Sequence, residues 1–486
     1  MTKLAEELRY AVRPRVILKY FGQFCLVIAV LTLVPLVVSL LYGETAITLR
    51  YLSVAAVLGV TGAGLARIKG RRGVQPNEAM VLVSLLFLVT PLIMSFPLMG
   101  SGLDFIDAFF EAVSGATTTG LSTTGTVAGK PSSFLFGRAW MQWYGGLGIV
   151  VLSLALTMRP GVTARSFAVT ETEPDDLVGG TRAHARRTVL IYGILTAGAV
   201  AILLVAGVGP TDSLLYSLAA VSTGGFAPHD ASLAGLSGAG AAVLVTIVGV
   251  AGALPFAYYL GRYKQPRYAR VAILQVKALV IAGAVVTVLL AATMLPVGGS
   301  TSGRWLHPPL MAFSAQTTTG FSSVPPSTLN GTAKLLLIAS MAIGGGIGST
   351  AGGIKIIRIL ILFTFARVLI LRISSAKHAV VEPRLSGRRL SEDDLREAMV
   401  LIAMFVITIF VSWIPFVGMG YDPLDSLFEV VSATATVGLS AGVTGPDLPA
   451  VLKGVLCADM LLGRLEIVAW LILLYPGTWF GRRLAD

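Results

Sequence analysis

The sequence is short of charged residues and of cysteine. Only 13% of its 486 residues are Asp, Glu, Lys or Arg, whereas 55% are hydrophobic and the mean hydropathy is +0.81. Soluble domains contain roughly 25% charged residues. The two cysteines, Cys25 and Cys457, lie in apolar segments near opposite ends of the chain, which excludes a disulfide framework. The histidines are too scattered for a metal cluster: His184, His229, His307 and His378. These shortages leave a polytopic membrane protein as the class that fits.

The formal net charge of +12 would suit a nucleic-acid-binding protein, but the distribution of the basic residues argues against one. They do not form one soluble face. They lie in short loops between apolar segments, as the positive-inside rule expects of cytoplasmic loops. The basic N-terminus leads into an apolar segment at 20–42 that is too long for the hydrophobic core of a signal peptide, so we interpret it as a retained helix.

Apolar runs of about 20 residues predict ten membrane-spanning segments. They lie at 20–42, 50–66, 78–99, 136–158, 187–208, 238–260, 271–295, 333–370, 397–418 and 452–479. Threading the chain through these spans in order places every basic segment on one side: the N-terminal tail, 67–72, 159–187, 262–270, 355–396 and 482–483. Their charge identifies that side as cytoplasmic, and both termini are expected there.

Four loops on the other side are long and rich in Gly, Ser and Thr, at 101–132, 209–236, 300–330 and 420–450. Each opens with a helix-like stretch too short to span a bilayer, which is typical of a re-entrant loop. Non-helical backbone at that depth is tolerated only where protein or a water-filled cavity surrounds it. We therefore predict an all-α polytopic membrane protein, with four pseudo-symmetric helix–pore loop–helix repeats around one central pore. The predicted units are an N-terminal helix pair (1–72) and repeats at 73–165, 166–264, 265–385 and 386–486.

The four loops superpose without gaps as ATTTGLS (116–122), VSTGGFA (221–227), QTTTGFS (316–322) and TATVGLS (434–440). One column is glycine throughout, and a threonine stands two residues before it. Rings of backbone carbonyls coordinate dehydrated cations, and glycine reaches the unusual φ/ψ that such rings need. A single loop of this kind would be an ordinary turn, but four registered copies predict a cation filter. Its residues are Thr117, Thr118, Thr119, Gly120, Leu121, Ser222, Thr223, Gly224, Gly225, Phe226, Thr317, Thr318, Thr319, Gly320, Phe321, Ala435, Thr436, Val437, Gly438 and Leu439.

These loops, with WMQWYGGLGIV (140–150), GGGIGSTAGGIKIIR (344–358) and MLLGRLEI (460–467), resemble the Trk/Ktr/HKT superfamily of potassium transporters over essentially the whole chain. The N-terminal helix pair is more like the TrkH membrane subunit than KtrB, whereas the fourth loop is closer to KtrB. In this family glycine at all four filter positions goes with potassium selectivity, and serine at the first with sodium permeation. The resemblance therefore implies K⁺ as the transported ion.

The resemblance also implies how such a chain works with others. It implies a transporter rather than an enzyme, without an organic cofactor, in the cytoplasmic (inner) membrane of a bacterium or archaeon. It further implies a homodimer, with one pore in each protomer. Because the chain shows no soluble nucleotide-binding region, regulation is expected from cytoplasmic nucleotide-binding subunits of the TrkA type that contact the basic loops.

The glycine-rich run IGGGIGSTAGGIK (343–355) interrupts the longest apolar segment. A phosphate-binding loop would need a preceding strand and a βαβ unit, and neither is expected inside a membrane span. We expect the glycines to unwind a pore-lining helix, with the freed backbone facing a cavity. The resemblance implies that this loop is a gate below the filter, formed by Gly344, Gly345, Gly346, Gly348, Ser349, Thr350, Gly352, Gly353 and Lys355. Lys355 and Arg358 are expected at the cytoplasmic mouth, although Arg358 could equally be a positive-inside anchor.

Arg464 and Glu466 lie in the middle of the last apolar segment, where an unpaired charge costs several kcal/mol. Two interpretations remain open. Either Arg464 belongs to a structural arginine–acid pair, or it reaches the pore below the filter as a barrier, which is what the resemblance implies.

The segment around 138–148 has a simpler interpretation. Trp140, Trp143 and Tyr144 suggest an interfacial aromatic belt, and the glycines at 145, 146 and 148 suggest close helix packing. No direct role in conduction is expected for this segment, Arg138 included.

Two transport mechanisms fit the sequence. One is a gated potassium pathway through the filter, and the other is a Na⁺- or H⁺-coupled symporter of the same architecture. Four loops that share one glycine column argue against the inverted repeats of many coupled carriers. A basic surface protein that binds lipid or nucleic acid is excluded by the hydropathy.

Overall fold

The fold is almost entirely helical. The computed structural model describes residues 11–69, 73–157, 177–261, 266–294, 304–374 and 381–481. Much of the predicted basic segments, both chain termini and the predicted boundaries at 165 and 264 lie outside these described residues. Within the described ranges, strands β1 (Arg384–Leu385) and β2 (Arg388–Arg389) pair antiparallel as a small hairpin. The predicted boundary at 385 falls at the end of β1.

The helices occur in the predicted order. The N-terminal pair is α2 (Pro14–Leu41) and α3 (Thr45–Ala66). Each repeat has a long first helix, a short pore helix and a second helix that is continuous only in the first repeat. The repeats comprise α4 (Pro76–Leu98), α5 (Phe105–Ala116) and α6 (Ser132–Thr157); α8 (Leu177–Val205), α9 (Pro210–Val221), α10 (Ala239–Ala253) and α11 (Phe256–Gly261); α12 (Pro266–Met294), α13 (His307–Gln316), α14 (Gly331–Ile343) and α15 (Ile356–Ser374); and α16 (Glu392–Gly418), α17 (Pro423–Thr434), α18 (Ala450–Arg464), α19 (Val468–Leu474) and α20 (Pro476–Trp479).

The first and second helices of each repeat differ in character. Six helices in the described ranges are long and apolar enough to cross a bilayer: Pro14–Leu41, Thr45–Ala66, Pro76–Ser101, Ala185–Val205, Arg270–Met294 and Glu392–Gly418. They are the N-terminal pair and the first helix of every repeat. The other four predicted spans, the second helices, also contain helix, but they carry buried polar residues such as Arg138 and Arg464 because they pack against the interior.

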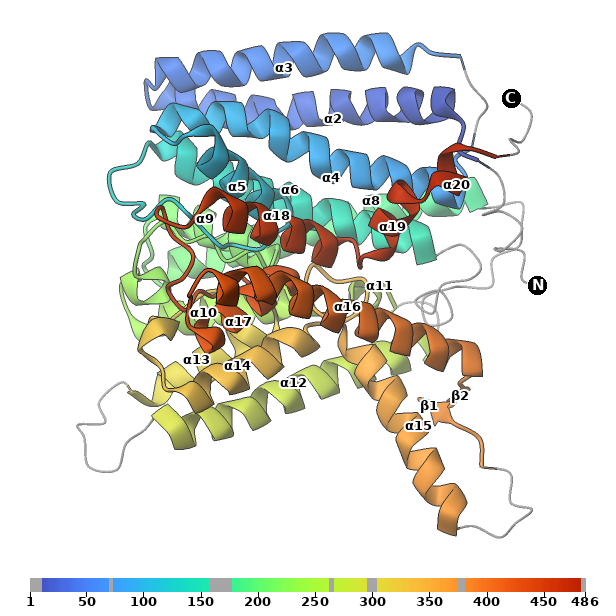
Figure 1. Ribbon diagram of the computed structural model, residues 1–486. Helices are drawn as coiled ribbons and strands as arrows, with labels where there is room; N and C mark the ends of the chain where they lie inside the picture. Colours follow the sequence, from blue (N-terminus) through green and yellow to red (C-terminus); the bar gives the residue numbers. More distant parts are fainter. Residues whose placement is uncertain are drawn as a thin grey trace.

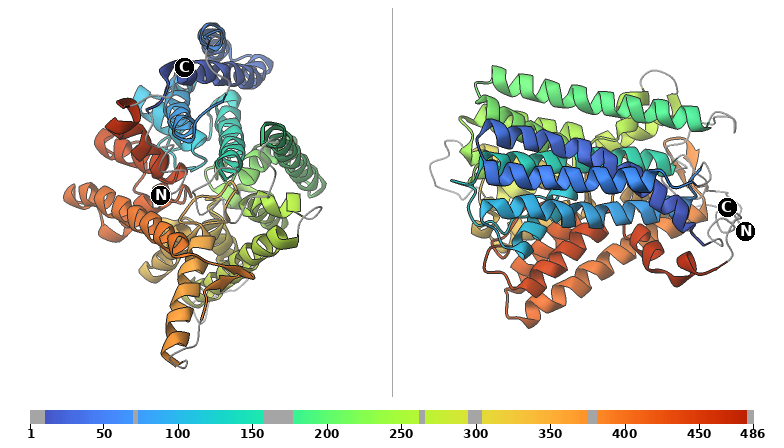
Figure 2. Two further views of the ribbon diagram at one scale, coloured as in Figure 1. Left: turned by 90° about the vertical axis from the view of Figure 1, so that its right-hand side faces the viewer. Right: turned by 90° about the horizontal axis from the view of Figure 1, so that it is seen from above.

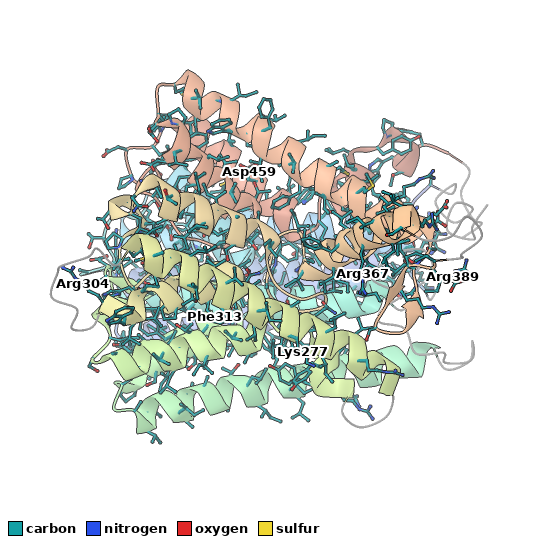
Figure 3. The ribbon with its side chains drawn as sticks, turned by 90° about the horizontal axis from the view of Figure 1, so that it is seen from below. Lys277, Arg304, Phe313, Arg367, Arg389 and Asp459 are labelled. Carbon is teal, nitrogen blue, oxygen red and sulfur yellow. The ribbon has the colours of Figure 1, made fainter. Side chains whose placement is uncertain are left out.

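The four repeats follow one another around a central axis. The second helix of each repeat contacts the pore helix of the next, through the pairs α6–α9, α10–α13, α14–α17 and α18–α5, and the last pair closes the circle. Along the axis, the colours run round the molecule in chain order (Figure 2, left). The pore helices gather toward the left end of Figure 1, whereas α15, the hairpin and α20 lie toward the right. Arg304 and Arg389 mark these opposite ends (Figure 3). The predicted fold class, with its four pseudo-symmetric repeats, is confirmed.

Three of the second helices are interrupted, and the apolar pattern revealed only the glycine-rich break between α14 and α15. Helix α10 ends before Leu254, whose backbone is extended (ψ 145°) ahead of Pro255. Residues before proline avoid the helical region. Helices α18 and α19 are separated where Glu466 and Ile467 take positive φ values of 57° and 64°. The predicted spans at 238–260 and 452–479 therefore each contain a break that hydropathy did not show.

The first and last described segments meet at one end of the molecule. The Val12 amide donates to the Thr478 carbonyl (2.9 Å). Next to it the buried Arg13 guanidinium pairs with the buried Glu78 carboxylate, Nε to Oε1 at 2.8 Å and Nη2 to Oε2 at 2.9 Å. The N-terminal helix pair is thereby fastened to the start of α4 and to α20, on the outside of the first repeat.

Candidate ion filter and gate

The four pore helices end in the same hydrogen-bonded turn. In α5 the Thr118 amide bonds the Gly115 carbonyl (3.0 Å), and the Thr119 amide bonds the Ser114 carbonyl (2.9 Å). This pair of bonds is a Schellman motif, whose central residue is left-handed. The same two bonds close the other helices, through Thr223–Ala220 and Gly224–Ala219, Thr318–Ala315 and Thr319–Ser314, and Thr436–Ala433 and Val437–Ser432. The predicted residues that precede the left-handed position are the helix C-caps: Thr117, Ser222, Thr317 and Ala435.

A threonine occupies the left-handed position in all four turns. Its φ is 54° at Thr118, and it is 52°, 53° and 51° at Thr223, Thr318 and Thr436. A β-branched residue with positive φ is a true outlier, and such strain persists only where the surrounding structure enforces it, commonly at functional sites. The glycine two residues later also has positive φ in every loop, between 78° and 95°. The backbone of the predicted filter is thus repeated four times.

The glycine column forms a closed ring. A Cβ added to any of these glycines would overlap a carbonyl oxygen of the next loop, in the pairs Gly120 with Gly224, Gly225 with Thr319, Gly320 with Val437, and Gly438 with Thr119. Each glycine therefore abuts the residue that precedes the glycine of its neighbour, and the fourth loop returns to the first. Four distant segments of the chain converge in the register that the sequence predicted.

The threonine hydroxyls of the filter loops differ in their hydrogen-bond partners. Those of Thr117 and Thr119 bond each other (2.8 Å), and the equivalent pair in the third loop does the same at 2.7 Å. Those of Thr118 and Thr436 are fully buried and have no hydrogen-bond partner within the described part of the chain. Within the described residues, two of the four left-handed threonines thus keep free hydroxyls, whereas Thr223 donates to the Ser222 carbonyl (2.7 Å) and Thr318 accepts from the Gly352 amide (2.8 Å).

The residues that follow the glycines anchor the loops from behind. Leu121, Phe226, Phe321 and Leu439 are each at most 3% exposed. Leu121, Phe321 and Leu439 belong to three different apolar clusters among the surrounding helices. Their side chains pack into protein, so only their backbone is available to line the ring.

Buried carboxylates brace the first and fourth loops. Glu111 accepts hydrogen bonds from the Ser122 hydroxyl (2.6 Å) and the Thr123 amide (2.9 Å), where the chain leaves the first filter segment. Glu429, nine residues before its glycine like Glu111, accepts from the Ser440 hydroxyl (2.6 Å). The sequence showed that these two glutamates share a column but gave no reason for it.

The other two loops are braced from the same column by different chemistry. The Tyr216 hydroxyl donates to the Ser232 carbonyl (2.6 Å), and the Met311 sulfur accepts from the Ser323 amide (3.4 Å). A carboxylate, a phenol or a thioether thus braces the loop from the same position, nine residues before the glycine. Residue identity alone could not reveal this shared role, although the spacing from the glycine could.

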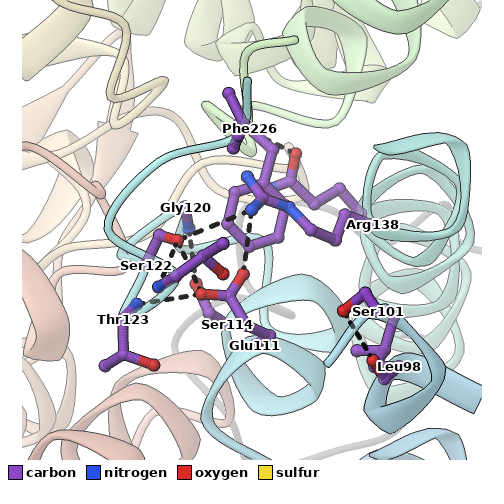
Figure 4. Close-up of polar contacts among 12 residues, drawn as sticks. Leu98, Ser101, Glu111, Ser114, Gly120, Ser122, Thr123, Arg138 and Phe226 are labelled. Atoms are coloured by element: carbon purple, nitrogen blue, oxygen red, sulfur yellow. Dashed lines mark hydrogen bonds and ion pairs between the residues drawn. The ribbon is translucent and has the colours of Figure 1, made fainter. Parts of the chain in front are cut away.

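Helix α6 contacts the first and second loops at once (Figure 4). The buried Arg138 places Nη1 3.2 Å from a Glu111 carboxylate oxygen, and its guanidinium lies 3.9 Å from the Phe226 ring centroid. One turn later, Gln142 donates to the Gly224 carbonyl and accepts from the Phe226 amide (3.2 Å). The sequence interpretation assigned this stretch no direct role in conduction, because a polar residue near a helix end resembles an interfacial one.

Packing on α6 follows the prediction only in part. A Cβ on Gly145 would overlap the Ala116 carbonyl, and one on Gly146 would lie 2.8 Å from the Tyr192 hydroxyl, so both glycines permit close contact. Gly148 has no neighbour within 4 Å in the described structure, which contradicts the prediction for it. Trp140 and Trp143 are half-buried, and their indole N–H groups bond α2 and α8, so they join helices.

Aspartates at the starts of three pore helices pair with basic residues, and the sequence did not suggest these pairs. An aspartate stands thirteen residues before the filter glycine in the first, second and fourth loops. The pairs are Asp107 with Lys453, Asp212 with His229, and Asp425 with Lys334. Each of the two lysines comes from the second helix of the preceding repeat. The two lysine–aspartate pairs therefore join successive repeats around the ring.

The glycine-rich loop is a largely buried segment, and protein groups bond several of its backbone atoms. The Gly346 amide donates to the Ala253 carbonyl (3.2 Å), and the Phe256 amide donates to the Gly348 carbonyl (3.1 Å). These bonds tie the loop to the break between α10 and α11. The freed backbone is therefore satisfied by protein, which is the other arrangement that membrane depth allows.

The glycines of this loop permit it to fold on itself. Gly344, Gly348 and Gly353 have φ values of 70°, 69° and 75°. A Cβ on Gly344 would overlap the Gly352 carbonyl, and one on Gly345 would overlap the Ala351 side chain. The Ser349 hydroxyl adds a bond to the Gly346 carbonyl (2.7 Å).

The loop lies directly against the filter threonines. The Thr350 and Thr223 hydroxyls are 3.2 Å apart, and the Gly352 amide donates to the Thr318 hydroxyl (2.8 Å). A Cβ on Gly352 would also overlap the Thr436 hydroxyl. Three of the four left-handed threonines thus contact this one segment.

Arg464 reaches the loop, and its neighbour Glu466 takes a different partner. The buried Arg464 guanidinium donates to the Thr350 carbonyl (2.7 Å) and has no carboxylate within ion-pair distance among the described residues. Glu466 pairs with Arg358. The structural arginine–acid pair that the sequence allowed is therefore formed by Arg358, which is more than a positive-inside anchor.

Lys355 lies within the loop. Its side chain is buried, its φ is 77°, and its ammonium group donates to the Ala351 carbonyl. The described residues contain no group of three or more His, Cys, Asp or Glu side chains that could hold a metal ion. Cation chemistry at this site would therefore depend on backbone and hydroxyl oxygens.

Comparisons with known proteins agree with this geometry. A family model described as TrkH, cation transport protein, matches residues 53–263 and 268–476. An uncharacterized cation transporter of Methanocaldococcus jannaschii is 30% identical over 464 residues, covering 94% of each chain. The Trk system potassium uptake protein TrkH of Escherichia coli K12 is 28% identical and covers 96% of this chain and 99% of its own. The crystal structure of the potassium transporter TrkH from Vibrio parahaemolyticus superposes with a TM-score of 0.83 at 25% identity, covering 96% of this chain and all of that one.

Proposed function

This chain belongs to the TrkH family of cation transport proteins, and we propose that it takes up K⁺ across the cytoplasmic membrane through a filter formed by its four re-entrant loops. The observation that carries the proposal is the closed ring of glycines, each against a carbonyl of the next loop. Relatives covering nearly the whole chain are named for potassium uptake. They are transporters, so we assign a transport function and no catalytic one, with K⁺ as cargo.

The proposed filter binds a dehydrated K⁺ with oxygens alone. Backbone carbonyls from four loops replace the hydration shell, and the free hydroxyls of Thr118 and Thr436 add ligands at its inner end. Each pore helix ends at this level, so the negative ends of four helix dipoles favour a cation there. Glycine at all four positions supports K⁺ as the cargo, because the loops approach without side chains between them.

The segment Gly344–Lys355 is the proposed gate. Its contacts with Thr223, Thr318 and Thr436 support a position that blocks the inner side of the filter. Arg464 adds a positive charge to this loop through its bond to Thr350, so it would repel a cation that leaves the filter. Displacement of the loop would open the path.

Regulation and assembly are further parts of the proposal. We place both termini on the cytoplasmic side, where the basic segments would contact nucleotide-binding subunits of the TrkA type. A homodimer is supported by α15, which extends away from the bundle in Figures 1 and 2. This helix exposes large apolar side chains, including Phe363, Ile370 and Ile373 at 68%, 66% and 87%.

The test is K⁺-dependent growth and Rb⁺ uptake in a potassium-uptake-deficient host that also expresses the regulatory subunit. Wild type should restore both, and Gly120→Ser should lower the preference for K⁺ over Na⁺. Absence of Rb⁺ uptake by a correctly inserted wild type would overturn the proposal. An unchanged ion preference in Gly120→Ser would remove the filter assignment alone.

One observation favours an H⁺-coupled alternative. Asp459 of α18 is fully buried, and one carboxylate oxygen accepts from the Ser412 hydroxyl (2.6 Å). The other oxygen has no partner among the described residues. Buried acids within a membrane often lie on ion pathways. In proteoliposomes, a pH gradient that drives Rb⁺ uptake in wild type but not in Asp459→Asn would favour coupling.

A further inference from the structure

The first and second filter loops are joined through an arginine that belongs to neither. Arg138 extends from α6 and is 3% exposed. On one side it pairs with Glu111 (3.2 Å), which holds the first loop through Ser122. On the other side its guanidinium lies 3.9 Å from the ring centroid of Phe226, directly after the second filter glycine. A cation over an aromatic face is attracted by the ring quadrupole, and more strongly when both groups are away from water.

A second contact joins the same two loops further out. Asp230, beyond the second filter segment, accepts hydrogen bonds from the Thr126 hydroxyl (2.7 Å) and the Val127 amide (2.6 Å) of the first loop. Asp230 thus joins the two loops a second time, and Arg138 balances the charge of the buried Glu111.

The equivalent carboxylate of the fourth loop, Glu429, has different partners from Glu111. Glu429 accepts from the Ser440 and Thr444 hydroxyls (both 2.6 Å) and from the Val443 amide (3.2 Å). Within the described residues no Lys, Arg or His lies within ion-pair distance of it. A hydroxyl thus takes the place that Arg138 takes beside Glu111. Of these two buried glutamates, Glu111 is the one that is paired with an arginine in the described structure.

We propose that Arg138 is a positioning residue that sets ion selectivity: by neutralising Glu111 and stacking on Phe226, it fixes the first loop against the second where Gly120 meets the Gly224 carbonyl. The inference rests on the filter function proposed above. Arg138 acts on two filter loops at once, because it contacts Glu111, which braces the first loop, and Phe226 of the second. Loss of these contacts would let the first and second loops separate, so that the filter could accommodate ions of other radii.

The experiment compares four variants in proteoliposomes, after K⁺ transport by wild type has been established. Arg138→Met removes the charge and the stack, and Phe226→Leu removes the stack with both charges intact. Glu111→Gln with Arg138→Met removes the pair without leaving a lone buried charge. Arg50→Gln is the matched control, since the Arg50 guanidinium also lies over a phenylalanine ring (Phe96, 4.9 Å) but in the N-terminal helix pair. The readouts are the K⁺/Na⁺ permeability ratio and the melting temperature.

We expect the permeability ratio to fall at least about tenfold in Arg138→Met, Phe226→Leu and the double variant, a change of ~1.4 kcal/mol in relative ion preference. Arg50→Gln should keep the wild-type ratio. A purely structural role would lower the melting temperature and leave the ratio unchanged. Folded Phe226→Leu and double variants with the wild-type ratio would overturn the inference. If Arg138→Met does not fold, these two variants decide. Wild type that transports no K⁺ would instead contradict the proposed function.

Discussion

Gly438 of the fourth loop lies against the carbonyl oxygen of Thr119 in the first loop. This contact closes the circle of repeats, because each of the other three glycines makes the same contact with its following loop. The ring allows no side chain at these positions. Contacts between backbone atoms therefore set the dimensions of the ring, and such contacts vary less than contacts between flexible side chains.

Replacement of a ring glycine should disrupt transport. In Gly320→Ala the new methyl group would overlap the Val437 carbonyl, and the backbone φ of 80° is strained for alanine. We expect Rb⁺ uptake or the K⁺/Na⁺ ratio to fall at least about tenfold, equivalent to ~1.4 kcal/mol. Gly148→Ala is the control, since nothing described lies within 4 Å of it. Uptake by Gly320→Ala within twofold of wild type would contradict the ring assignment.

A methyl group between gate and filter should open the pathway. In Gly352→Ala it would overlap the Ala435 carbonyl and the Thr436 hydroxyl, so the loop must move away from the filter. We expect faster Rb⁺ leak from vesicles that lack the regulatory subunit. Gly445→Ala, in an outer loop without neighbours within 4 Å, should leak like wild type. A leak from Gly352→Ala no faster than that of this control would argue against the loop as the gate.

The architecture could be predicted because it is repeated and therefore over-determined. Hydropathy gave helix in all ten predicted ranges, and a gapless register of four loops gave the ring of Gly120, Gly225, Gly320 and Gly438. Repetition turned a weak local pattern into a specific one. The prediction required only that residues at equivalent positions of the four loops have equivalent roles.

What the sequence could not show depends on contacts between distant segments. The break at Glu466 and Ile467 has no glycine or proline signal, and is maintained where Glu466 pairs with Arg358. Tyr216 and Glu111 brace their loops from one column, yet they share no chemistry. No direct role in conduction was predicted for Arg138, because its partners lie on other elements.

Loss of the charge at Arg464 should raise basal flux. The guanidinium donates to the Thr350 carbonyl, so in the proposed mechanism it holds the gate and adds positive charge below the filter. Arg464→Met removes both effects at similar volume, so Rb⁺ efflux without the regulatory subunit should increase. Arg464→Lys keeps the charge and should remain closer to wild type. Equal efflux from wild type and Arg464→Met would contradict the barrier role.

Asp230 should give a small, pH-dependent contribution to stability. Burial acts to raise its pKa, but hydrogen bonds from Thr126, Val127 and Ala128 and the charge of Arg138 outweigh it, and the pKa is lowered. A lowered carboxyl pKa stabilises the fold above the ordinary pKa and loses that effect as the pH falls through the lowered value.

Asp230→Asn should therefore melt slightly below wild type at pH 7. Its free energy of unfolding should be lower by no more than about 1 kcal/mol, because the residue is exposed. The difference should shrink below roughly pH 4. The exposed Asp447→Asn is the control. A difference that grows on acidification would show that the sign is wrong.

The buried pair of Arg13 and Glu78 should matter for stability and not for selectivity. Glu78 also accepts the Arg13 amide (3.0 Å) and the Gln75 amide (2.8 Å), so it joins the N-terminal segment to the start of α4, at the end of the molecule away from the filter. Removing one partner leaves an uncompensated buried charge, which costs about 3–5 kcal/mol. Glu78→Gln should lower the melting temperature, whereas Arg13→Met with Glu78→Met should recover part of the loss, because the lone charge is gone. Both variants should keep the wild-type K⁺/Na⁺ ratio. A changed ratio in a variant of wild-type stability would mean that the N-terminal helix pair acts on the filter, since α4 leads directly into the first pore helix.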